Sequence, residues 1–466
     1  MLGVVIDFES TSEPKYIQLY HYLKSEIENG NIPPYEKLPS VRALSQTLKV
    51  SKVTVENAYN QLQLEGYIES RAKSGYFVMQ LGNHDLTTKR LYTNRSTSSG
   101  FVRETSKPYN SDGAEASTFN FTQWRKVVNR VLEYDTDQLL SYGDVKGELM
   151  LRTEIAKFVR HTRGVSCEPE QIVIGAGIQY LFGLIATTFR TNHGIIAFEH
   201  PGFSKGMYVF EDYGYARAEI PLERDGIDIK ALEASKAKVV YVSPSHQYPM
   251  GGVMGIKKRL QLLEWASKSN GYIIEDDYDS LLRYDGMPVP ALQGLRDGEH
   301  VIYVGSFSKL LIPALRISFM VIPRTLNEAF NQVISRYSQS VSKIEQLALA
   351  RYMAEGAFER HIRRIKKTYG KKNQRLLETF KSINSQWLAL MGKGSGLHVT
   401  LKLDKKVNRD VFIKSCEAVG ILLEPVVGYN DSIVVFSYSG ILDDQMMDVV
   451  KTMCRIAEES AHIIKS

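Results

Sequence analysis

The chain has 466 residues, of which 43% are hydrophobic and 24% are charged, and its formal net charge is +6. This length predicts at least two domains, and the composition is ordinary for a soluble globular protein. No apolar run is long enough to cross a bilayer, the N-terminus lacks the features of a secretory signal, and three widely spaced cysteines favour neither disulfides nor a zinc site. We therefore expect a cytoplasmic protein with no membrane or metal partner.

Three helices are predicted near the N-terminus. Apolar side chains recur at helical spacing over residues 16–28. Ser40 can cap a second helix over residues 41–48, and Ser51 can cap a third over residues 52–65, because a serine hydroxyl accepts a hydrogen bond from a free amide of the first turn. The short connection between the second and third helices predicts a helix-turn-helix.

A hairpin with a basic tip is expected next, since the strand-like runs 67–70 and 76–79 flank Arg71-Ala-Lys-Ser-Gly75. Residues 1–80 hold eight basic and nine acidic side chains, so net charge alone does not indicate DNA binding. The ordered pattern nevertheless resembles the winged helix of the GntR family of bacterial regulators. It consists of Leu38-Pro-Ser-Val-Arg42, Val50-Ser-Lys-Val-Thr54, Glu65-Gly-Tyr67 and Ser74-Gly-Tyr-Phe-Val78.

That resemblance implies which side chains contact double-stranded DNA. A single one of these residues, such as Ser40, is more simply explained as a helix cap or part of a solvated helix face, and it is the ordered set that favours DNA contact. Many members of the family have glycine where this chain has Tyr35. The implied contacts are Lys37, Ser40 and Arg42 to phosphates, Ser51, Lys52 and Thr54 in the major groove, and Arg71, Lys73 and Ser74 at the backbone or minor groove.

A flexible linker is expected over residues 82–118, which are polar and rich in Ser, Thr, Asn and Gly. The predicted DNA-binding domain is therefore residues 1–81, and a second domain covers 119–466. Basic side chains outnumber acidic ones in the linker, which would allow contact with DNA phosphates, but a solvated spacer is the simpler interpretation.

From residue 119 onward, helical segments alternate with short apolar runs. This alternation predicts an α/β fold with a doubly wound sheet, whose ligands bind at the carboxyl ends of the strands. The predicted strands are Gln171–Gly175, Gly194–Phe198, Val239–Val242, Gly271–Ile274, Val301–Val304 and Phe319–Ile322.

The residues after these strands suit pyridoxal phosphate (PLP). Ser306-Phe-Ser-Lys309 is followed seven residues later by Arg316, and Asp276 ends another strand. An aldehyde cofactor needs a lysine for a Schiff base, an acid for its pyridine nitrogen, and hydroxyls with a cation for its phosphate. Gly175-Ala-Gly177 opens a predicted helix, and the free amides of a helix N-terminus favour an anion.

Over residues 120–460 the chain resembles fold-type I aminotransferases, with a smaller C-terminal subdomain over about 332–466. The matching segments are Leu140-Ser-Tyr-Gly-Asp with Gly147, Arg163-Gly-Val, Gln171–Gln179, His200-Pro-Gly-Phe203, Ser243–Gly251, Glu275–Asp279, Ser306-Phe-Ser-Lys309 and Gly394–His398.

The resemblance implies a role for each matching residue. We expect Asp277 and Asp279 to lie outside direct cofactor contact, because like charges repel, and His246 and His398 are each more often structural than ligand-binding. The implied roles are Lys309 holding the aldehyde, Asp276 pairing with the pyridinium nitrogen, Tyr278 bonding the ring hydroxyl, Phe203 stacking on the ring, and Ser306, Ser308, Arg316 and the Ala176 and Gly177 amides holding the phosphate.

A winged helix ahead of an aminotransferase-like domain resembles the MocR/GabR subfamily of GntR regulators. Membership implies a PLP-dependent transcription factor, commonly a head-to-tail homodimer, and an operator with paired half-sites. It implies an effector-binding rather than a catalytic use of the large domain, with slow half-transamination still compatible. The competing hypothesis is a catalytically active aminotransferase.

The effector hypothesis depends on one departure from the family pattern. Aminotransferases usually carry an arginine on a late strand to clamp the ligand's α-carboxylate, but valines fill that position in Asp431-Ser-Ile-Val-Val-Phe-Ser-Tyr-Ser439. We therefore expect PLP itself to be sensed, as in PdxR-type activators of vitamin B6 synthesis. The alternative is an amino acid or amine joined to the aldehyde and bound through Lys205, His246 or Arg283.

Overall fold

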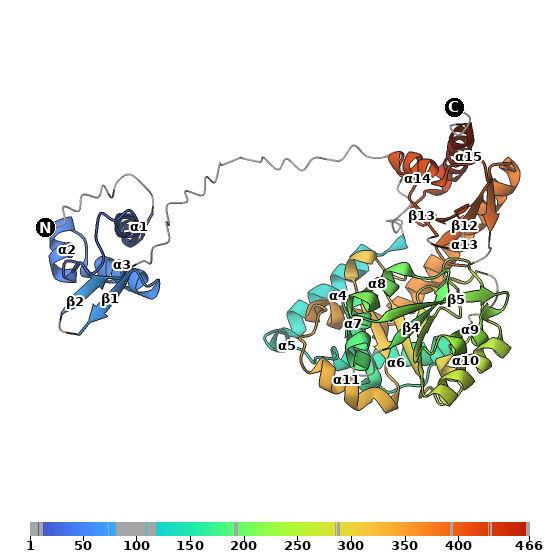
Figure 1. Ribbon diagram of the computed structural model, residues 1–466, viewed down its shortest axis with the longest axis horizontal. Coiled ribbons are helices and arrows are strands. Elements are labelled where there is room, and N and C mark those ends of the chain that lie inside the picture. Colours follow the sequence, from blue (N-terminus) through green and yellow to red (C-terminus); the bar gives the residue numbers. More distant parts are fainter. Residues whose placement is uncertain are drawn as a thin grey trace. The chain divides into compact units, whose positions relative to one another are not determined.

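The computed structural model describes residues 8, 13–72, 74–80, 109, 118–190, 194–284, 286, 289–391, 395–426, 428 and 431–462. Within it the chain divides into two compact units, residues 1–103 and 104–466 (Figure 1). No helix in the described ranges is long and apolar enough to cross a membrane.

The N-terminal unit is the predicted winged helix. It contains α1 (Lys15–Glu28), α2 (Val41–Leu48), α3 (Lys52–Leu64) and an antiparallel hairpin of β1 (Ile68–Arg71) and β2 (Gly75–Val78). The expected caps are present, because Ser40 Oγ accepts from the Ala43 amide at 3.2 Å and Ser51 Oγ accepts from the Thr54 amide at 3.1 Å. The local pattern thus fixed both helix starts correctly.

One small core holds this unit together. Leu19 and Leu23 of α1 pack against Val55 and Tyr59 of α3, and all four side chains are buried. Tyr35 has a φ of 69°, in the left-handed region that favours glycine. This conformation explains why a glycine is typical at that position in the family.

The second unit contains an eight-stranded sheet of order β3-β10-β9-β8-β7-β4-β5-β6. The run from β9 to β5 is parallel, whereas β10 is antiparallel to both of its neighbours. All six predicted strands are confirmed. The bounds are β3 (Ile172–Gly175), β4 (Ile195–His200), β5 (Ala216–Glu223), β6 (Gly226–Ile227), β7 (Val239–Val242), β8 (Tyr272–Asp277), β9 (Val301–Ser306) and β10 (Ser318–Val321).

Helices pack on both faces of this sheet (Figure 1), as expected for a doubly wound fold. One face is covered by α4 (Phe121–Tyr134), α6 (Leu149–Arg163), α12 (Lys343–Ala354), α9 (Ile229–Ala234) and α10 (Ile256–Ser269), with the short α5 (Thr136–Leu139) after α4. The other face is covered by α7 (Ile178–Phe189), α8 (Ser204–Asp212) and α11 (Asn327–Ile334).

The C-terminal subdomain has its own sheet and core. Its strands have the order β11-β12-β14-β13 and are antiparallel. The elements are α13 (Ala357–Ile383), β11 (Leu388–Met391), β12 (His398–Leu403), α14 (Arg409–Ala418), β13 (Leu423–Pro425), β14 (Ile433–Ser437) and α15 (Met446–His462).

The two cores of this unit meet along α13. Phe358 near its start belongs to the large-domain core, whereas Leu376 and Phe380 belong to the C-terminal core. Because α11 and α12 bury their apolar faces against the large sheet, the subdomain core begins later than the expected boundary near residue 332. Tyr109, which falls in the expected linker, packs on the C-terminal core.

Candidate cofactor site and DNA-binding surface

The residues predicted to bind the aldehyde ring gather at the carboxyl ends of the large sheet. Asp276 is the penultimate residue of β8. Lys309 follows β9, which is the neighbour of β8 in the sheet. Lys309 Nζ lies 4.9 Å from the centroid of the Tyr278 ring. Two neighbouring strands, whose paired residues such as Asp276 and Val304 are 28 positions apart in sequence, thus place an amine beside a phenol and a carboxylate.

Asp276 presents a buried acceptor that lacks a donor. Its side chain is 6% exposed, and its Oδ2 accepts a short hydrogen bond from the Tyr241 hydroxyl. Its Oδ1 has no hydrogen-bond partner among the described residues. Burial raises the pKa of Asp276 to about 7, against the lowering effects of Tyr241 and Lys309. A buried acceptor without a donor is costly unless a ligand supplies one, and a protonated pyridine nitrogen is such a donor.

Tyr278 belongs to a chain of polar contacts. Its hydroxyl lies 3.0 Å from His246 Nδ1, and that nitrogen lies 2.7 Å from Asp279 Oδ1. Burial raises the pKa of Tyr278, so the phenol is neutral and able to donate to an oxygen of a ligand. The ring centroid of His398 lies 5.4 Å from that of His246. Both histidines therefore lie at the site, although the sequence favoured a structural role for them.

His398 has an unusual environment for a polar ring. It is buried, and neither ring nitrogen has a hydrogen-bond partner within the described part of the chain. Burial lowers the pKa of His398 well below its ordinary value, and the charge of Lys309 lowers it further. The imidazole is therefore neutral across the physiological range and offers one donor and one acceptor to the site.

The predicted phosphate end is built around a glycine. Gly177 has a φ of 94° and directly precedes α7, and a Cβ at this position would lie 2.5 Å from Arg316 Nη2. Only glycine therefore allows the guanidinium to approach the helix N-terminus this closely. Ser306 Oγ accepts from the Ser318 hydroxyl at 3.0 Å and from the Ser308 amide at 3.3 Å. The structure thus places a cation, a serine pair and a helix N-terminus together.

The expected roles of the Ala176 and Gly177 amides need correction. The Ala176 amide donates to Ser340 Oγ at 3.0 Å, and the Gly177 amide donates to the Gly175 carbonyl at 2.8 Å. No side chain caps α7, so the amides of the helix itself, from Ile178 onward, are the better donors to an anion. The sequence could not show this, because Ser340 lies 164 residues away.

Sequence reasoning assigned no role to the ion pair beneath the site. Arg163 Nε lies 2.5 Å from Asp277 Oδ2, and both side chains are almost completely buried. Burial alone would raise the pKa of Asp277, but Arg163 and a hydrogen bond from Tyr303 hold it below its ordinary value. Asp277 thus remains ionised, with Arg163 and Tyr303 as its partners. One signal for this ion pair was available in the sequence, because Arg163-Gly-Val is among the segments that match fold-type I aminotransferases.

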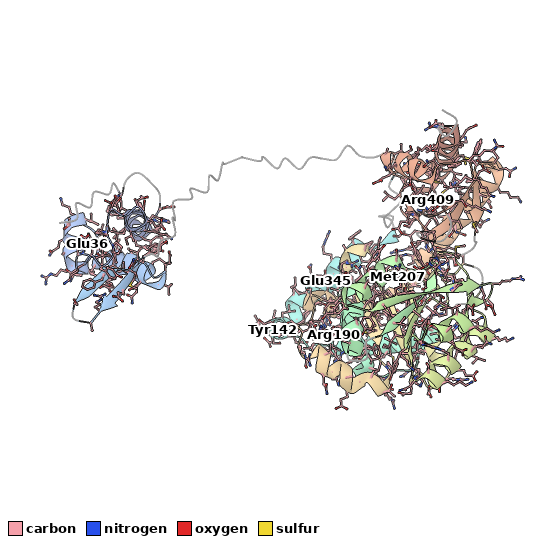
Figure 2. All side chains as sticks on the ribbon, in the orientation of Figure 1. Glu36, Tyr142, Arg190, Met207, Glu345 and Arg409 are labelled. Carbon is pink, nitrogen blue, oxygen red and sulfur yellow. The ribbon has the colours of Figure 1, made fainter. Side chains whose placement is uncertain are left out.

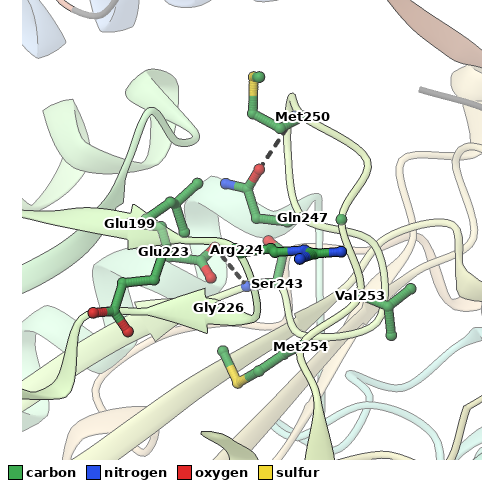
Figure 3. A pocket seen from close by; sticks show the side chains of 11 residues that line it. Glu199, Glu223, Arg224, Gly226, Ser243, Gln247, Met250, Val253 and Met254 are labelled. Carbon is green, nitrogen blue, oxygen red and sulfur yellow. Dashed lines mark hydrogen bonds between the residues drawn. The ribbon is translucent and has the colours of Figure 1, made fainter. Parts of the chain in front are cut away.

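Residues of the 243–254 loop help to line a further cavity of about 320 Å³ (Figure 3). Glu199 Oε2 accepts from the Ser243 amide at 3.0 Å inside it, and burial raises the pKa of Glu199 to about 7. The residues that line it include none of the predicted cofactor residues. They are Glu199, Leu222, Glu223, Arg224, Gly226, Ser243, Gln247, Met250, Gly252, Val253 and Met254.

The predicted DNA contacts lie on the surface of the winged helix. Thr54 is partly buried, and its hydroxyl lies 2.8 Å from Ser51 Oγ, so part of its polarity is used within the cap. Arg71 pairs with Glu69 and lies 4.6 Å from the Phe77 ring centroid, which orients its side chain on the wing. Lys73 lies outside the described residues. The other predicted contacts, all exposed, are Lys37, Ser40, Arg42, Ser51, Lys52 and Ser74.

Two family models match the chain in tandem. Residues 15–78 match the model described as bacterial regulatory proteins, gntR family. Residues 110–438 match the model described as aminotransferase class I and II. The second match covers well over half of the chain, so the family of the large domain is shown.

Curated relatives share this whole organisation. The HTH-type transcriptional regulator YdeL of Bacillus subtilis is 37% identical over 418 residues, covering 89% of this chain and 89% of YdeL. The probable rhizopine catabolism regulatory protein MocR of Rhizobium meliloti is 31% identical, covering 89% and 86%. The pyridoxine biosynthesis transcriptional regulator PdxR of Corynebacterium glutamicum is 31% identical, covering 85% and 84%.

A solved structure confirms the fold of the second unit. The kynurenine aminotransferase of Pyrococcus horikoshii, determined in complex with PMP, superimposes with a TM-score of 0.67 at 25% identity. The match covers 75% of this chain and 90% of that enzyme. Together these comparisons show that the chain belongs to the aminotransferase class I and II family and carries a GntR-family helix-turn-helix ahead of that domain, the organisation of the MocR subfamily.

Proposed function

We propose that this protein is a transcriptional regulator whose large domain holds PLP on Lys309 and uses its occupancy to control DNA binding. The observation that carries the cofactor is the buried Asp276 oxygen that has no donor within the described chain, close to a lysine and a buried phenol. The observation that carries the DNA function is the winged helix with its exposed recognition residues. Such a regulator works where bacterial DNA is, in the cytoplasm.

Each predicted residue has a defined task toward the cofactor. When bound, PLP supplies an aldehyde that reacts with amines and a ring that accepts electrons. Asp276 stabilises the protonated pyridine nitrogen, and Tyr278 donates to the ring hydroxyl. Phe203 directly precedes α8, and its ring centroid lies 6.3 Å from those of both Tyr241 and Tyr248, which suits a ring-stacking position. Ser306, Ser308, Arg316 and the α7 N-terminus hold the phosphate.

The first candidate for the molecule that the regulator senses is PLP itself. Its support is the 31% identity to PdxR, a regulator named for pyridoxine biosynthesis, together with the valines in place of a carboxylate-clamping arginine. An amino compound that binds the PLP-loaded protein is the second candidate. The contacts that Glu424 of β13 makes with Tyr248 and Lys205 favour this second candidate.

Use of the large domain for sensing rather than for catalysis is also part of the proposal. A transaminase must bind both an amino donor and a keto acceptor, and their carboxylates need a cation. β14 offers Val434 and Val435 instead. The relatives with the same domain order are named as regulators. Slow half-transamination is compatible with this use, whereas rapid multiple turnover is not.

A head-to-tail homodimer that reads paired half-sites completes the proposal. Four large apolar side chains within residues 140–150 support it, because Leu140 and Tyr142, next to α5, and Leu149 and Met150 of α6 are all exposed. Figure 2 shows Tyr142 at the edge of the large domain. Monomeric soluble proteins seldom expose such a group of large apolar side chains, and a partner subunit would cover it. Two-fold symmetry then predicts two operator half-sites.

Operator binding measured with and without PLP tests the proposal. An operator would first be selected from random DNA with the full-length protein, and its affinity would then be measured for the cofactor-free and PLP-loaded forms. The proposal predicts a clear difference in affinity between the two forms. Equal affinities, or aminotransferase turnover at ordinary enzyme rates, would contradict it.

A further inference from the structure

One face of the C-terminal sheet meets the cofactor site. Val435 of β14 is paired with Thr400 of β12 and with Glu424 of β13, so these three side chains lie on the same face. The Thr400 hydroxyl donates to the Pro249 carbonyl at 2.6 Å. This face therefore lies against the 243–251 segment of the large domain, which also supplies His246 and Tyr248.

The strand register shows which valine replaces the expected arginine. Val434 is fully buried in the C-terminal core, on the opposite face of β14. Val435 lies on the same face as Thr400 and packs against Met250, so it faces the segment that supplies His246 and Tyr248. Its neighbour in the sheet is Glu424, so the position where a ligand carboxylate would need a cation instead has a carboxylate beside it.

Glu424 reaches the site through Tyr248. Its Oε2 accepts from the Tyr248 hydroxyl at 2.8 Å. The Tyr248 ring centroid lies 5.4 Å from that of His398 and 6.2 Å from that of Tyr278, the residue whose ring faces Lys309. Burial alone would raise the pKa of Glu424, but the Tyr248 hydroxyl and the charges of Lys205 and Lys309 hold it below its ordinary value. Glu424 is therefore an anion at neutral pH.

Glu424 attracts an ammonium group, as its ion pair with Lys205 shows. Lys205 Nζ lies 3.2 Å from Glu424 Oε1, but the side chain of Lys205 is 66% exposed and that of Glu424 is 56% exposed. An exposed pair of this kind contributes little stability, and its flexible ammonium can leave. The guanidiniums of Arg316 and Arg163, described above, have other contacts, because Arg316 lies against Gly177 and Arg163 pairs with Asp277. An ammonium group of a ligand can therefore replace that of Lys205.

We propose that Glu424 and Tyr248 form an ammonium subsite, and that the ligand of the PLP-loaded protein is an amine with a second positive charge, a diamine or polyamine. The carboxylate of an amino acid at the same place would lie against the Glu424 carboxylate, and like charges at close range repel. This inference rests on the proposed function only in requiring PLP on Lys309. The inference goes beyond the proposed function by naming the chemical class of a second ligand.

The test compares three straight-chain amines that differ only at the far end. For chains of three to five carbons, these are the α,ω-diamine, the ω-amino carboxylic acid and the simple alkylamine. Binding to PLP-loaded protein is measured by calorimetry and by the change in cofactor absorbance. We expect the diamine of the best length to bind about tenfold more tightly than the alkylamine, and the amino acid to bind most weakly.

Three variants separate the possible explanations. Glu424→Gln should remove the preference for the diamine, and Lys205→Gln should maintain or strengthen diamine binding because it removes the competing ammonium. Glu264→Gln on α10, which breaks an exposed pair with Lys268, is the charge-matched control and should leave all affinities unchanged. Loss of diamine binding in Lys205→Gln would overturn the ammonium subsite, because it would show that Lys205 helps to bind the ligand rather than competing with it.

Each result then has a definite meaning. Tighter binding of the amino acid than of the diamine, an unchanged preference in Glu424→Gln, or no binding of any diamine to protein with normal cofactor absorbance overturns the ammonium subsite. Protein that shows no cofactor absorbance after addition of PLP instead contradicts the proposed function, so the two failures are distinguishable.

Discussion

The two units of this molecule place their functional residues in opposite environments. In the winged helix the predicted DNA contacts among the described residues are exposed except for the partly buried Thr54, and the unit depends on two serine caps and one small core. In the large domain the predicted cofactor residues include a buried carboxylate, and their pKa values depend on that burial. The comparison teaches that DNA recognition depends on residues of a local surface, whereas cofactor binding depends on long-range packing. Single mutations should therefore affect one function without the other.

The largest separation is expected from Lys309→Ala. Loss of the amine proposed to hold the aldehyde should abolish the visible absorbance of the PLP-loaded protein, while the affinity of the cofactor-free form for its operator should not change. Lys268→Ala, at an exposed lysine of α10, is the matched control. A variant that folds normally but loses operator affinity in the cofactor-free form would break the comparison.

The second prediction uses the raised pKa of Asp276. Its pKa is about 7 in the folded protein and 3.8 in the ordinary state, so the folded form binds the proton more tightly and stability falls as pH rises between these values. From pH 5.5 to pH 8 this carboxyl should cost the cofactor-free protein about 2 kcal/mol. Asp276→Asn should remove that part of the pH dependence.

Urea unfolding followed by tryptophan fluorescence measures this effect in one unit alone. The three tryptophans, Trp124, Trp265 and Trp387, all lie within residues 104–466. Glu199 is present in both proteins, so the effect of its own burial cancels, whereas the raising effect of the Asp276 charge on the pKa of Glu199 belongs to the measured difference. Parallel stability curves for the two proteins from pH 5.5 to pH 8 would contradict the buried, proton-binding Asp276.

A smaller change is expected from Arg42→Ala in the winged helix. Removal of one phosphate contact should weaken operator binding by about 1 kcal/mol and reduce the magnitude of the salt slope by about 1, without any change in cofactor absorbance. Arg455→Ala, at an exposed arginine of α15, is the control. An unchanged salt slope would remove Arg42 from the DNA interface.

The smallest effect concerns Tyr35, whose φ of 69° is unfavourable for side chains branched at Cβ. Tyr35→Val should lower local stability by roughly 1 kcal/mol, whereas Tyr35→Gly should change it less, because glycine adopts this conformation without strain. Amide hydrogen exchange of α3 in the full-length protein measures both. Equal protection in the two variants would show that backbone strain at this position is unimportant.

Much of this molecule could be predicted from its sequence because the signals are local. Helix caps at Ser40 and Ser51, the strand runs and the Ser306–Lys309 motif each lie within a few residues. The engagement of the Ala176 amide by Ser340 and the pairing of Glu424 with Val435 could not be predicted, since each joins segments that only the folded chain brings together. Long-range register, not composition, decides which of two adjacent valines faces the site.

Borohydride reduction of the PLP-loaded protein, followed by peptide mass spectrometry, tests the central claim most directly. Because borohydride fixes a lysine-bound aldehyde permanently, the account predicts one phosphopyridoxyl adduct, located on Lys309, in protein that is coloured before reduction. Colourless protein without an adduct, or an adduct located on a different lysine, would contradict it.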